Sequence, residues 1–306
     1  MSSMTKVMVS PHIHSGRSTT AIMRDVLLAL VPATVAGVVV FGLRALLPVF
    51  VCLASSIGFE ALFNFITKKE QTVTDLSAAV TGLLLALNLP ANVPVWQCVV
   101  GSLFAIIVVK CLFGGLGNNL VNPAITARVF MLVAFESMAV AAFPVDAVSS
   151  ATPLAAEEMP SLFEMLLGNY GGAIGETCTL ALIIGGIYLI ARRVITWHVP
   201  VVFIGTVFAF SLVMEGFDVI SALSLIMAGG LFIGAIFMAT DYVTSPSTAW
   251  GKVIFALGAG LITCLIRYFG NYPEGVSFAI LFMNILTPYI DQWTKHKVFA
   301  TEGGRS

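Results

Sequence analysis

The sequence predicts an all-α integral membrane protein with about ten transmembrane helices in two inverted five-helix repeats. Three observations support this prediction. Of the 306 residues, 58% are hydrophobic and only 10% are charged, whereas a soluble domain carries about 25% charged residues. The apolar residues fall in runs of about 20, the length that a helix needs to cross a bilayer. The two halves of the chain also resemble each other weakly.

Ten apolar segments are candidate spans. Most are uninterrupted, but the third is short, and the fifth begins with Pro123 and contains Arg128 and Glu136. The first follows Arg17 and Arg24 without a clean cleavage site, so we interpret it as a helix and not as a removable signal. In order, the expected spans are 21–42, 45–66, 75–89, 94–113, 123–140, 173–191, 199–215, 220–239, 249–267 and 274–293.

The distribution of Lys and Arg orients these spans, because basic residues in short loops stay in the cytoplasm. Basic residues occur before the first span, in the 2–3 and 6–7 loops and after the last span, but none lies between Arg128 and Arg192. Both termini are therefore expected in the cytoplasm, although Arg267, near the predicted outer face, does not fit this pattern. The predicted organisation is a cytoplasmic segment 1–20, a first repeat 21–140, an extracytoplasmic loop 141–172, a second repeat 173–293 and a cytoplasmic tail 294–306.

The internal similarity appears at an offset of 152 residues. This offset places Pro48 on Pro200 and Gly82 on Gly234, and further on an offset of 157 places Lys110 on Arg267. Each half would hold five spans, and an odd number means that the second half enters the membrane inverted. Such proteins place their site near the midplane, between the halves.

Several classes of site are not predicted. The five cysteines are scattered without CxxC spacing, so we interpret them as small buried hydrophobes. His12 and His14 have no nearby Cys or carboxylate partner, so no metal site is expected, and no basic run suggests nucleic acid. The chain has no GxGxxG motif, P-loop or iron–sulfur cysteine set, and we predict no catalytic residue.

Two polar segments interrupt the apolar pattern. In GGLGNNLVNPAITAR (114–128), Asn119 and Asn122 could cap a helix or could bind a cofactor or ion. Arg128, inside a span, needs an anionic partner, such as Glu136 or a bound group. In TDYVTSPSTAW (240–250), Asp241 and the hydroxyls could coordinate Na⁺ or cap a helix, and capping is favoured.

Three charged residues lie near predicted span ends: Glu60, Lys110 and Arg267. Long side chains in such places commonly extend their charged ends to the membrane surface. We therefore expect all three to snorkel.

The stretch DAVSSATPL (146–154) lies in the predicted extracytoplasmic loop. By chemistry alone, Thr152 is only a potential ester anchor in a polar loop. Together with four further segments, however, this stretch resembles the D subunits of Rnf ferredoxin:NAD⁺ oxidoreductases and the homologous B subunits of Na⁺-translocating NADH:quinone oxidoreductases. The chain lacks the long N-terminal extension of the B subunits, which favours the Rnf type. The further segments are SPHIHSGRSTTAIM, GGLGNNLVNPAITARVF, TDYVTSPSTAWGK and NILTPYID.

The resemblance implies a covalent FMN. In that family a Thr at the end of an S-G/x-A-T motif carries FMN through a phosphoester bond, and the matching residue is Thr152. Asp146 and Ser149 would belong to the segment that a flavin transferase recognises, and Ala151 would leave room for that enzyme. Ser150 stands where many members have Gly. A second, non-covalent riboflavin is left open. Asn119, Asn122 and Arg128 are further candidate cofactor contacts, with Arg128 facing a flavin phosphate.

The resemblance also implies a function. The chain would be a flavin-carrying subunit of a translocase in the inner membrane of a prokaryotic cell. With partner subunits of types A, B, C, E and G, it would couple electron transfer from ferredoxin to NAD⁺ with Na⁺ or H⁺ translocation. The alternative is a solute transporter or channel without a redox role, because inverted repeats suit one equally well.

Overall fold

The structure is a computed structural model that describes residues 18–135, 160–270 and 275–294. Within these ranges the regular elements are helices and no strand is present. The coarse prediction of an all-α protein is therefore confirmed for this part of the chain. Four predicted site residues (Asp146, Ser149, Ala151 and Thr152) and Glu136 lie outside the described residues.

Each predicted span contains helix, within slightly different bounds. The first half comprises α1 (Thr19–Phe41), α2 (Leu46–Ile66), α3 (Ser77–Leu87), α4 (Val95–Leu103) with a π-helical continuation (Phe104–Cys111), and α5 (Pro123–Ala134). The second half comprises α6 (Leu162–Leu167), α7 (Thr179–Ala191), α8 (His198–Met214), α9 (Val219–Met227), α10 (Leu231–Ile233) with a π-helical continuation (Gly234–Met238), α11 (Ala249–Phe269) and α12 (Val276–Thr294). The short helix α6 was not predicted; it begins with a capping box in which Ser161 and Glu164 hydrogen-bond reciprocally.

Three helical stretches in the described residues are long and apolar enough to cross a membrane on their own: α1, Leu43–Ile66 and α11. A fourth results if α9 and the Leu231–Met238 helix are counted as one bent span. Five further apolar helices are shorter, at 10–17 residues. The structure thus supports a membrane protein, with several helices that do not reach the usual length of a span.

Local signals in the sequence explain where several helices begin. The side chain of Ser18 accepts a hydrogen bond from the backbone N–H of Ala21 (3.2 Å) at the start of α1. Asn122 caps α5, where Pro123 occupies the first helical position. Thr248 caps α11 by accepting from the N–H of Gly251 (3.0 Å). The predicted capping roles of Asn122 and Thr248 are therefore confirmed.

The predicted span 220–239 is broken. A bend of 65° separates α9 from the helix that begins at Leu231, and Gly229 at the break has φ +70°, a conformation that glycine adopts without strain. Arg267 of α11 donates hydrogen bonds to the carbonyl oxygens of Leu225 (2.8 Å) and Ala228 (3.2 Å). The expectation that Arg267 snorkels is therefore wrong, because its guanidinium satisfies carbonyls at the end of α9 that have lost their helical partners.

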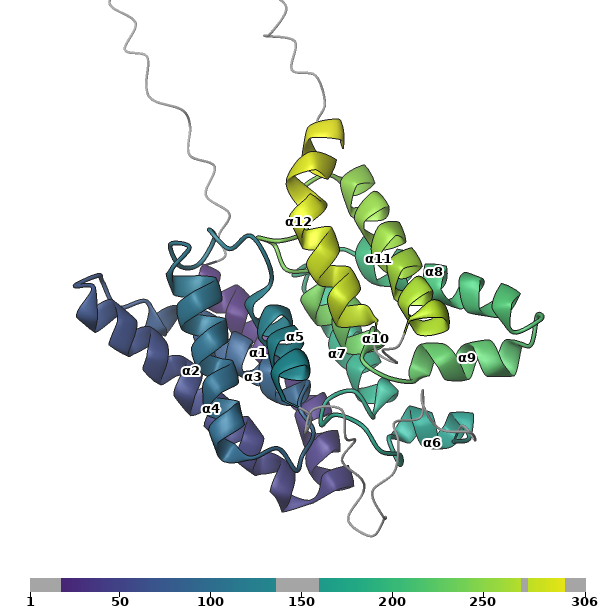
Figure 1. Cartoon of the computed structure of the whole chain (residues 1–306), viewed down its shortest axis with the longest axis horizontal. Coiled ribbons are helices and arrows are strands. Elements are labelled where there is room, and N and C mark those ends of the chain that lie inside the picture. The colour runs from purple at the N-terminus through teal and green to yellow at the C-terminus, as the bar shows by residue number, and fades with distance from the viewer. Residues whose placement is uncertain (1–17, 136–159, 271–274, 295–306) are drawn as a thin grey trace, which may run out of the picture.

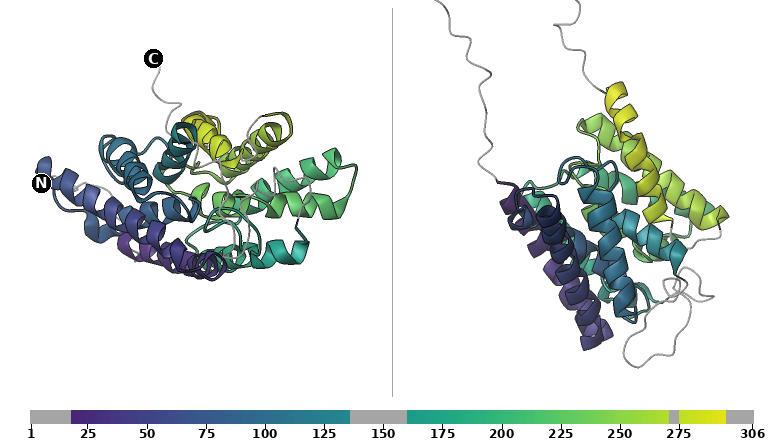
Figure 2. Two further views of the ribbon diagram at one scale, coloured as in Figure 1. Left: turned by 60° about the horizontal axis from the view of Figure 1, so that its bottom comes forward. Right: turned by 60° about the vertical axis from the view of Figure 1, so that its left-hand side comes forward.

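The two halves lie side by side (Figure 1), with α1–α5 on one side of the molecule and α8, α9, α11 and α12 on the other; Figure 2 gives two further views. Helix α1 packs against α7, and α5 packs against α12. A Cβ on Gly185 of α7 would collide with the carbonyl oxygen of Ala29 in α1. This glycine therefore lets the two helices approach closely, as small residues do in membrane helix pairs.

Candidate functional site

The structure brings together the two polar segments that the sequence singled out. Residues 114–122 precede α5, residues 240–248 precede α11, and α12 contacts both. The side-chain amide of Asn284, oriented to satisfy both neighbours, donates to the carbonyl oxygen of Thr244 (3.2 Å) and accepts from the N–H of Asn122 (3.1 Å). Thr287 also donates to the Thr244 carbonyl oxygen (2.9 Å). Residues from both halves therefore form one polar junction.

Asn122 links the two halves through its side chain. Its Oδ1 accepts from the N–H groups of Ala124 (3.0 Å) and Ile125 (3.2 Å), which caps α5. Its Nδ2 donates to the carbonyl oxygen of Met238 (3.3 Å), at the end of the π-helical turn in the second half. The predicted capping role of Asn122 is therefore confirmed. Asn122 also lines a pocket.

This pocket, which we call the junction pocket, lies between the halves and holds about 760 Å³ of non-atom space, its open mouth included. Asn119 is only 8% exposed, lines the pocket, and its buried Oδ1 has no hydrogen-bond partner in the described residues. A buried acceptor without a partner is costly, so the site suits a ligand that donates a hydrogen bond. The polar lining is Ser77, Thr81, Lys110, Asn119, Asn122, Thr240, Asp241 and Tyr242.

Asp241 is the acidic residue of the junction pocket lining. Its carboxylate accepts hydrogen bonds from the hydroxyl of Thr244 (3.2 Å) and from the N–H of Val243 (3.5 Å). Desolvation by burial raises the pKa of this carboxyl. In the described residues no group of three or more His, Cys, Asp or Glu could hold a metal ion. In the segment 240–250, the hydroxyl of Thr244 donates to Asp241 and Thr248 caps α11. The capping role is the one that the sequence favoured.

The raised pKa of Asp241 predicts a pH-dependent effect of Asp241→Asn on thermal stability. Above the folded-state pKa, the charge of this half-buried, desolvated carboxylate destabilises the fold. Below the unfolded value, at about pH 3, the carboxyl is neutral in both states and the penalty vanishes. The stability linked to this group is thus lost as pH rises through the folded-state pKa. We expect the variant to raise the thermal midpoint of the detergent-solubilised protein at about pH 8 and to leave it nearly unchanged at about pH 3. An equal shift at both pH values would contradict this.

Arg128 lies elsewhere in the interior. It is 7% exposed, and its guanidinium contacts Oδ1 of Asn88 and, at 3.6 Å, Oε2 of Glu176. Of the two roles that the sequence left open, the structure therefore provides internal pairing, with Glu176 as the carboxylate. Arg128 is not among the residues that line the junction pocket, so a contact with a flavin phosphate stays a prediction.

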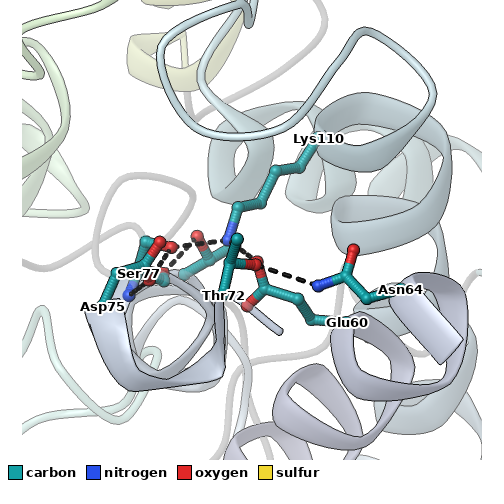
Figure 3. Close-up of polar contacts among 7 residues, drawn as sticks. Glu60, Asn64, Thr72, Asp75, Ser77 and Lys110 are labelled. Atoms are coloured by element: carbon teal, nitrogen blue, oxygen red, sulfur yellow. Dashed lines mark hydrogen bonds and ion pairs between the residues drawn. The ribbon is translucent and has the colours of Figure 1, made fainter. Parts of the chain in front are cut away.

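A buried ion pair was missed. The Lys110 ammonium lies 2.7 Å from Oε1 of Glu60, and the two residues are 1% and 2% exposed (Figure 3). Lys110 also donates to Oγ of Ser77 (2.6 Å). The expectation that Glu60 and Lys110 snorkel is therefore wrong, because each neutralises the other inside the protein and neither needs to reach the surface. The sequence did contain a signal for this pair, because Glu60 and Lys110 carry opposite charges near the same ends of the predicted second and fourth spans.

Comparison with known proteins adds to this geometry. The chain matches the model of the NQR2, RnfD, RnfE family over residues 6–300. It is 46% identical over 301 residues to the D subunit of the Na⁺-translocating ferredoxin:NAD⁺ oxidoreductase complex of Acetobacterium woodii, covering 95% of this chain and 93% of that protein. It is 41% identical over 314 residues to the proton-translocating counterpart of Clostridium ljungdahlii, covering 95% of each. The D subunit of the ion-translocating oxidoreductase complex of Halorhodospira halophila is 35% identical over 341 residues, covering 97% of this chain and 96% of that protein.

Proposed function

Because the chain belongs to the NQR2, RnfD, RnfE family, we propose that it is a membrane subunit of an ion-translocating ferredoxin:NAD⁺ oxidoreductase complex. In this role it carries flavin and relays electrons while Na⁺ or H⁺ crosses the membrane. The observation that carries the proposal is the 46% and 41% identity to two D subunits over at least 93% of their length. One of these relatives is described as Na⁺-translocating and the other as proton-translocating, so both coupling ions stay within the proposal.

The experiment that tests this role removes the chain from its host. Membranes from the deletion strain are assayed for NAD⁺ reduction by reduced ferredoxin and for ion uptake into inverted vesicles. We expect both activities to disappear and to return with a plasmid-borne copy. If both persist, and the purified chain alone transports a solute in liposomes, the chain is a transporter and the proposal fails.

We propose for the membrane arrangement ten spans in two inverted five-helix repeats, with both termini in the cytoplasm. The supporting observation is that the offset of 152 residues aligns the first residue of α2, Leu46, with the first residue of α8, His198. The same offset lays α3 over α10 and its π-helical continuation. The contacts of α1 with α7 and of α5 with α12 join corresponding helices of the halves, which fits a two-fold relation. Partner subunits of types A, B, C, E and G would surround this fold.

The proposed function includes FMN attached to Thr152 by a flavin transferase. Its support is the SSAT motif at 149–152 together with the charge distribution that predicts an extracytoplasmic loop. Covalent attachment would keep a flavin in a compartment from which a weakly held one would diffuse away. The redox chemistry belongs to the flavin, whereas the protein positions it and tunes its potential.

The junction pocket is our candidate site for a second, non-covalent flavin such as riboflavin. A flavin ring presents both N–H and carbonyl groups, and its ribityl chain carries hydroxyls. The Oδ1 atom of Asn119, buried and without a partner in the described residues, can accept a hydrogen bond from such a donor. The apolar lining, for example Leu84 and Phe237, suits the flat ring. The bound flavin would supply one- and two-electron chemistry between the halves.

Asn119→Leu is expected to remove the non-covalent flavin and leave the covalent one. Leucine has nearly the same size but no acceptor, so the loss of one buried hydrogen bond should lower flavin retention at least about tenfold. The matched control is Asn118→Leu in the same loop; Asn118 is exposed and its side chain only reaches the carbonyl oxygen of Gly114 (3.4 Å). Flavin released by acid precipitation of the purified complex is the measurement. Equal release from both variants and the wild type would exclude Asn119 as a contact.

A further inference from the structure

A continuous series of hydrogen bonds runs from the protein surface to the junction pocket (Figure 3). The hydroxyl of Thr72, which is exposed in the 2–3 loop, accepts from Nδ2 of Asn64 (3.0 Å) and donates to Oε1 of Glu60 (2.9 Å). Lys110 donates to the same Oε1 (2.7 Å) and to Oγ of Ser77 (2.6 Å). Ser77 and Lys110 both line the pocket. A surface hydroxyl is thus linked to the pocket wall through two buried ionisable groups.

At the inner end of this series, Lys110 and Glu60 can each form a further hydrogen bond. An ammonium group has three donors, and the two hydrogen bonds of Lys110 leave one for a pocket ligand. Oε2 of Glu60 is buried and has no hydrogen-bond partner in the described residues. Thr72 and Lys110 both donate to Oε1, so a proton that passes from Thr72 to this oxygen lies within hydrogen-bond reach of Lys110. Both features suit proton transfer better than a purely structural ion pair, in which every polar atom would be satisfied.

The surroundings of the ion pair are partly apolar. A small apolar cluster lies beside the ion pair, built from Ala78, Ile106 and Cys111 with Ile57, Phe59 and Phe63 packed against it. The series through Thr72 and Glu60 is one polar connection between the 2–3 loop and this wall of the pocket. A second connection starts at Asp75, whose Oδ1 accepts a hydrogen bond from Oγ of Ser77.

We propose that Thr72, Glu60 and Lys110 form a proton relay that supplies a redox ligand in the junction pocket. The inference rests on the proposed non-covalent flavin, because flavin reduction takes up protons as well as electrons. Lys110 gives one proton to the ligand and becomes a neutral amine. The hydroxyl of Thr72 passes its proton to Glu60 while it takes one from water, and Glu60 passes that proton on to Lys110.

The step balances and has a driving force. One proton leaves the solvent for each proton that the ligand binds; the electrons come from the complex, and none passes through these residues. When Lys110 has lost its proton, Glu60 is left as a buried carboxylate without its counter-charge, which is costly in a low-dielectric interior. That cost draws the next proton inward from Thr72. The ion pair therefore resets itself after each transfer.

The test compares Thr72→Val with Thr72→Ser in the purified complex. Thr72 is exposed, so neither change creates a cavity, and only valine removes the hydroxyl. We follow reduction of the non-covalent flavin by stopped-flow absorbance in H₂O and in D₂O. We expect the valine variant to reduce this flavin at least about tenfold more slowly, with an altered solvent isotope effect, whereas the serine variant stays within about twofold of the wild type.

Each outcome is decisive. A valine variant with the wild-type rate and isotope effect overturns the relay, and so does one that has lost its flavin, since that indicates a structural role. A wild-type complex without acid-releasable flavin refutes instead the proposed flavin site and removes the basis of the relay. A second variant, Lys110→Arg, keeps the positive charge on a group that does not release its proton. If it binds flavin but reduces it as fast as the wild type, Lys110 is not the donor.

Discussion

Replacement of Thr152 by valine is expected to abolish covalently bound flavin completely. Valine has nearly the same shape as threonine but has no side-chain oxygen, so a phosphoester to FMN cannot form. The expected result is all or none, because a covalent bond survives denaturation and a bound flavin does not. The measurement is in-gel flavin fluorescence of the denatured chain, expressed in a host that supplies a flavin transferase.

Two control variants sharpen this experiment. Ser150→Gly changes the motif to the residue that many members of the resembled family carry, and it should keep full fluorescence. Thr248→Val removes a hydroxyl from the other Ser/Thr-rich segment, where Thr248 caps α11, and it should also stay fluorescent. A dark wild-type band from a flavinylating host would refute covalent attachment. A fluorescent Thr152→Val band would place the anchor on another residue.

The sequence was sufficient to predict most of the helices, because an apolar run of the length of a bilayer is rarely anything but a membrane helix. It also identified α3 as short, since the run between the polar residues before Ser77 and the Asn88–Pro90 turn is brief. The break between α9 and α10 was not predicted, because the run 220–239 carries no charged residue and was interpreted as one span. The Gly229–Gly230 pair was the local signal of a break, whereas the guanidinium from α11 that binds the carbonyl oxygens of Leu225 and Ala228 lies far away in the sequence.

The candidate site was predicted in parts but not as a whole. Capping by Asn122 and Thr248 is a local property of a few neighbouring residues, so the pattern identified it. The contact between their two segments runs through Asn284 and Thr287 of α12, far away in the sequence. Only the packing of α12 against α5 brings these polar groups together, and no local sequence pattern predicts that packing.

Glu60 and Lys110 were misinterpreted because each was considered alone. A single charge near the end of a span usually snorkels. A pair of opposite charges at the same depth on neighbouring helices can instead stay buried, since each satisfies the other without water. Helix α2 packs against both α3 and the helix that carries Lys110, and this arrangement places Ser77 of α3 beside the pair.

The same ion pair supports the second large expected effect, which is on stability. Lys110→Met leaves Glu60 as a buried charge without a partner, and Glu60→Leu does the same to Lys110. Each single substitution is expected to destabilise the fold by about 3–5 kcal/mol. The double variant replaces the pair with apolar side chains of similar volume and should recover most of that loss. Thermal unfolding of the purified protein in detergent, followed by intrinsic fluorescence, measures the effect.

A contact at the surface provides the control for this comparison. Glu215 is exposed and its carboxylate accepts a hydrogen bond from the hydroxyl of Tyr268 (3.0 Å). Because water replaces this contact readily, Glu215→Gln should change stability by no more than about 0.5 kcal/mol. If the two single variants at the buried pair are as mild as this control, water or another group already compensates the remaining charge. If the double variant is as unstable as the single ones, the loss comes from packing and not from an uncompensated charge. Recovery in the double variant alone would show that Glu60 and Lys110 remain buried together because each cancels the other's charge.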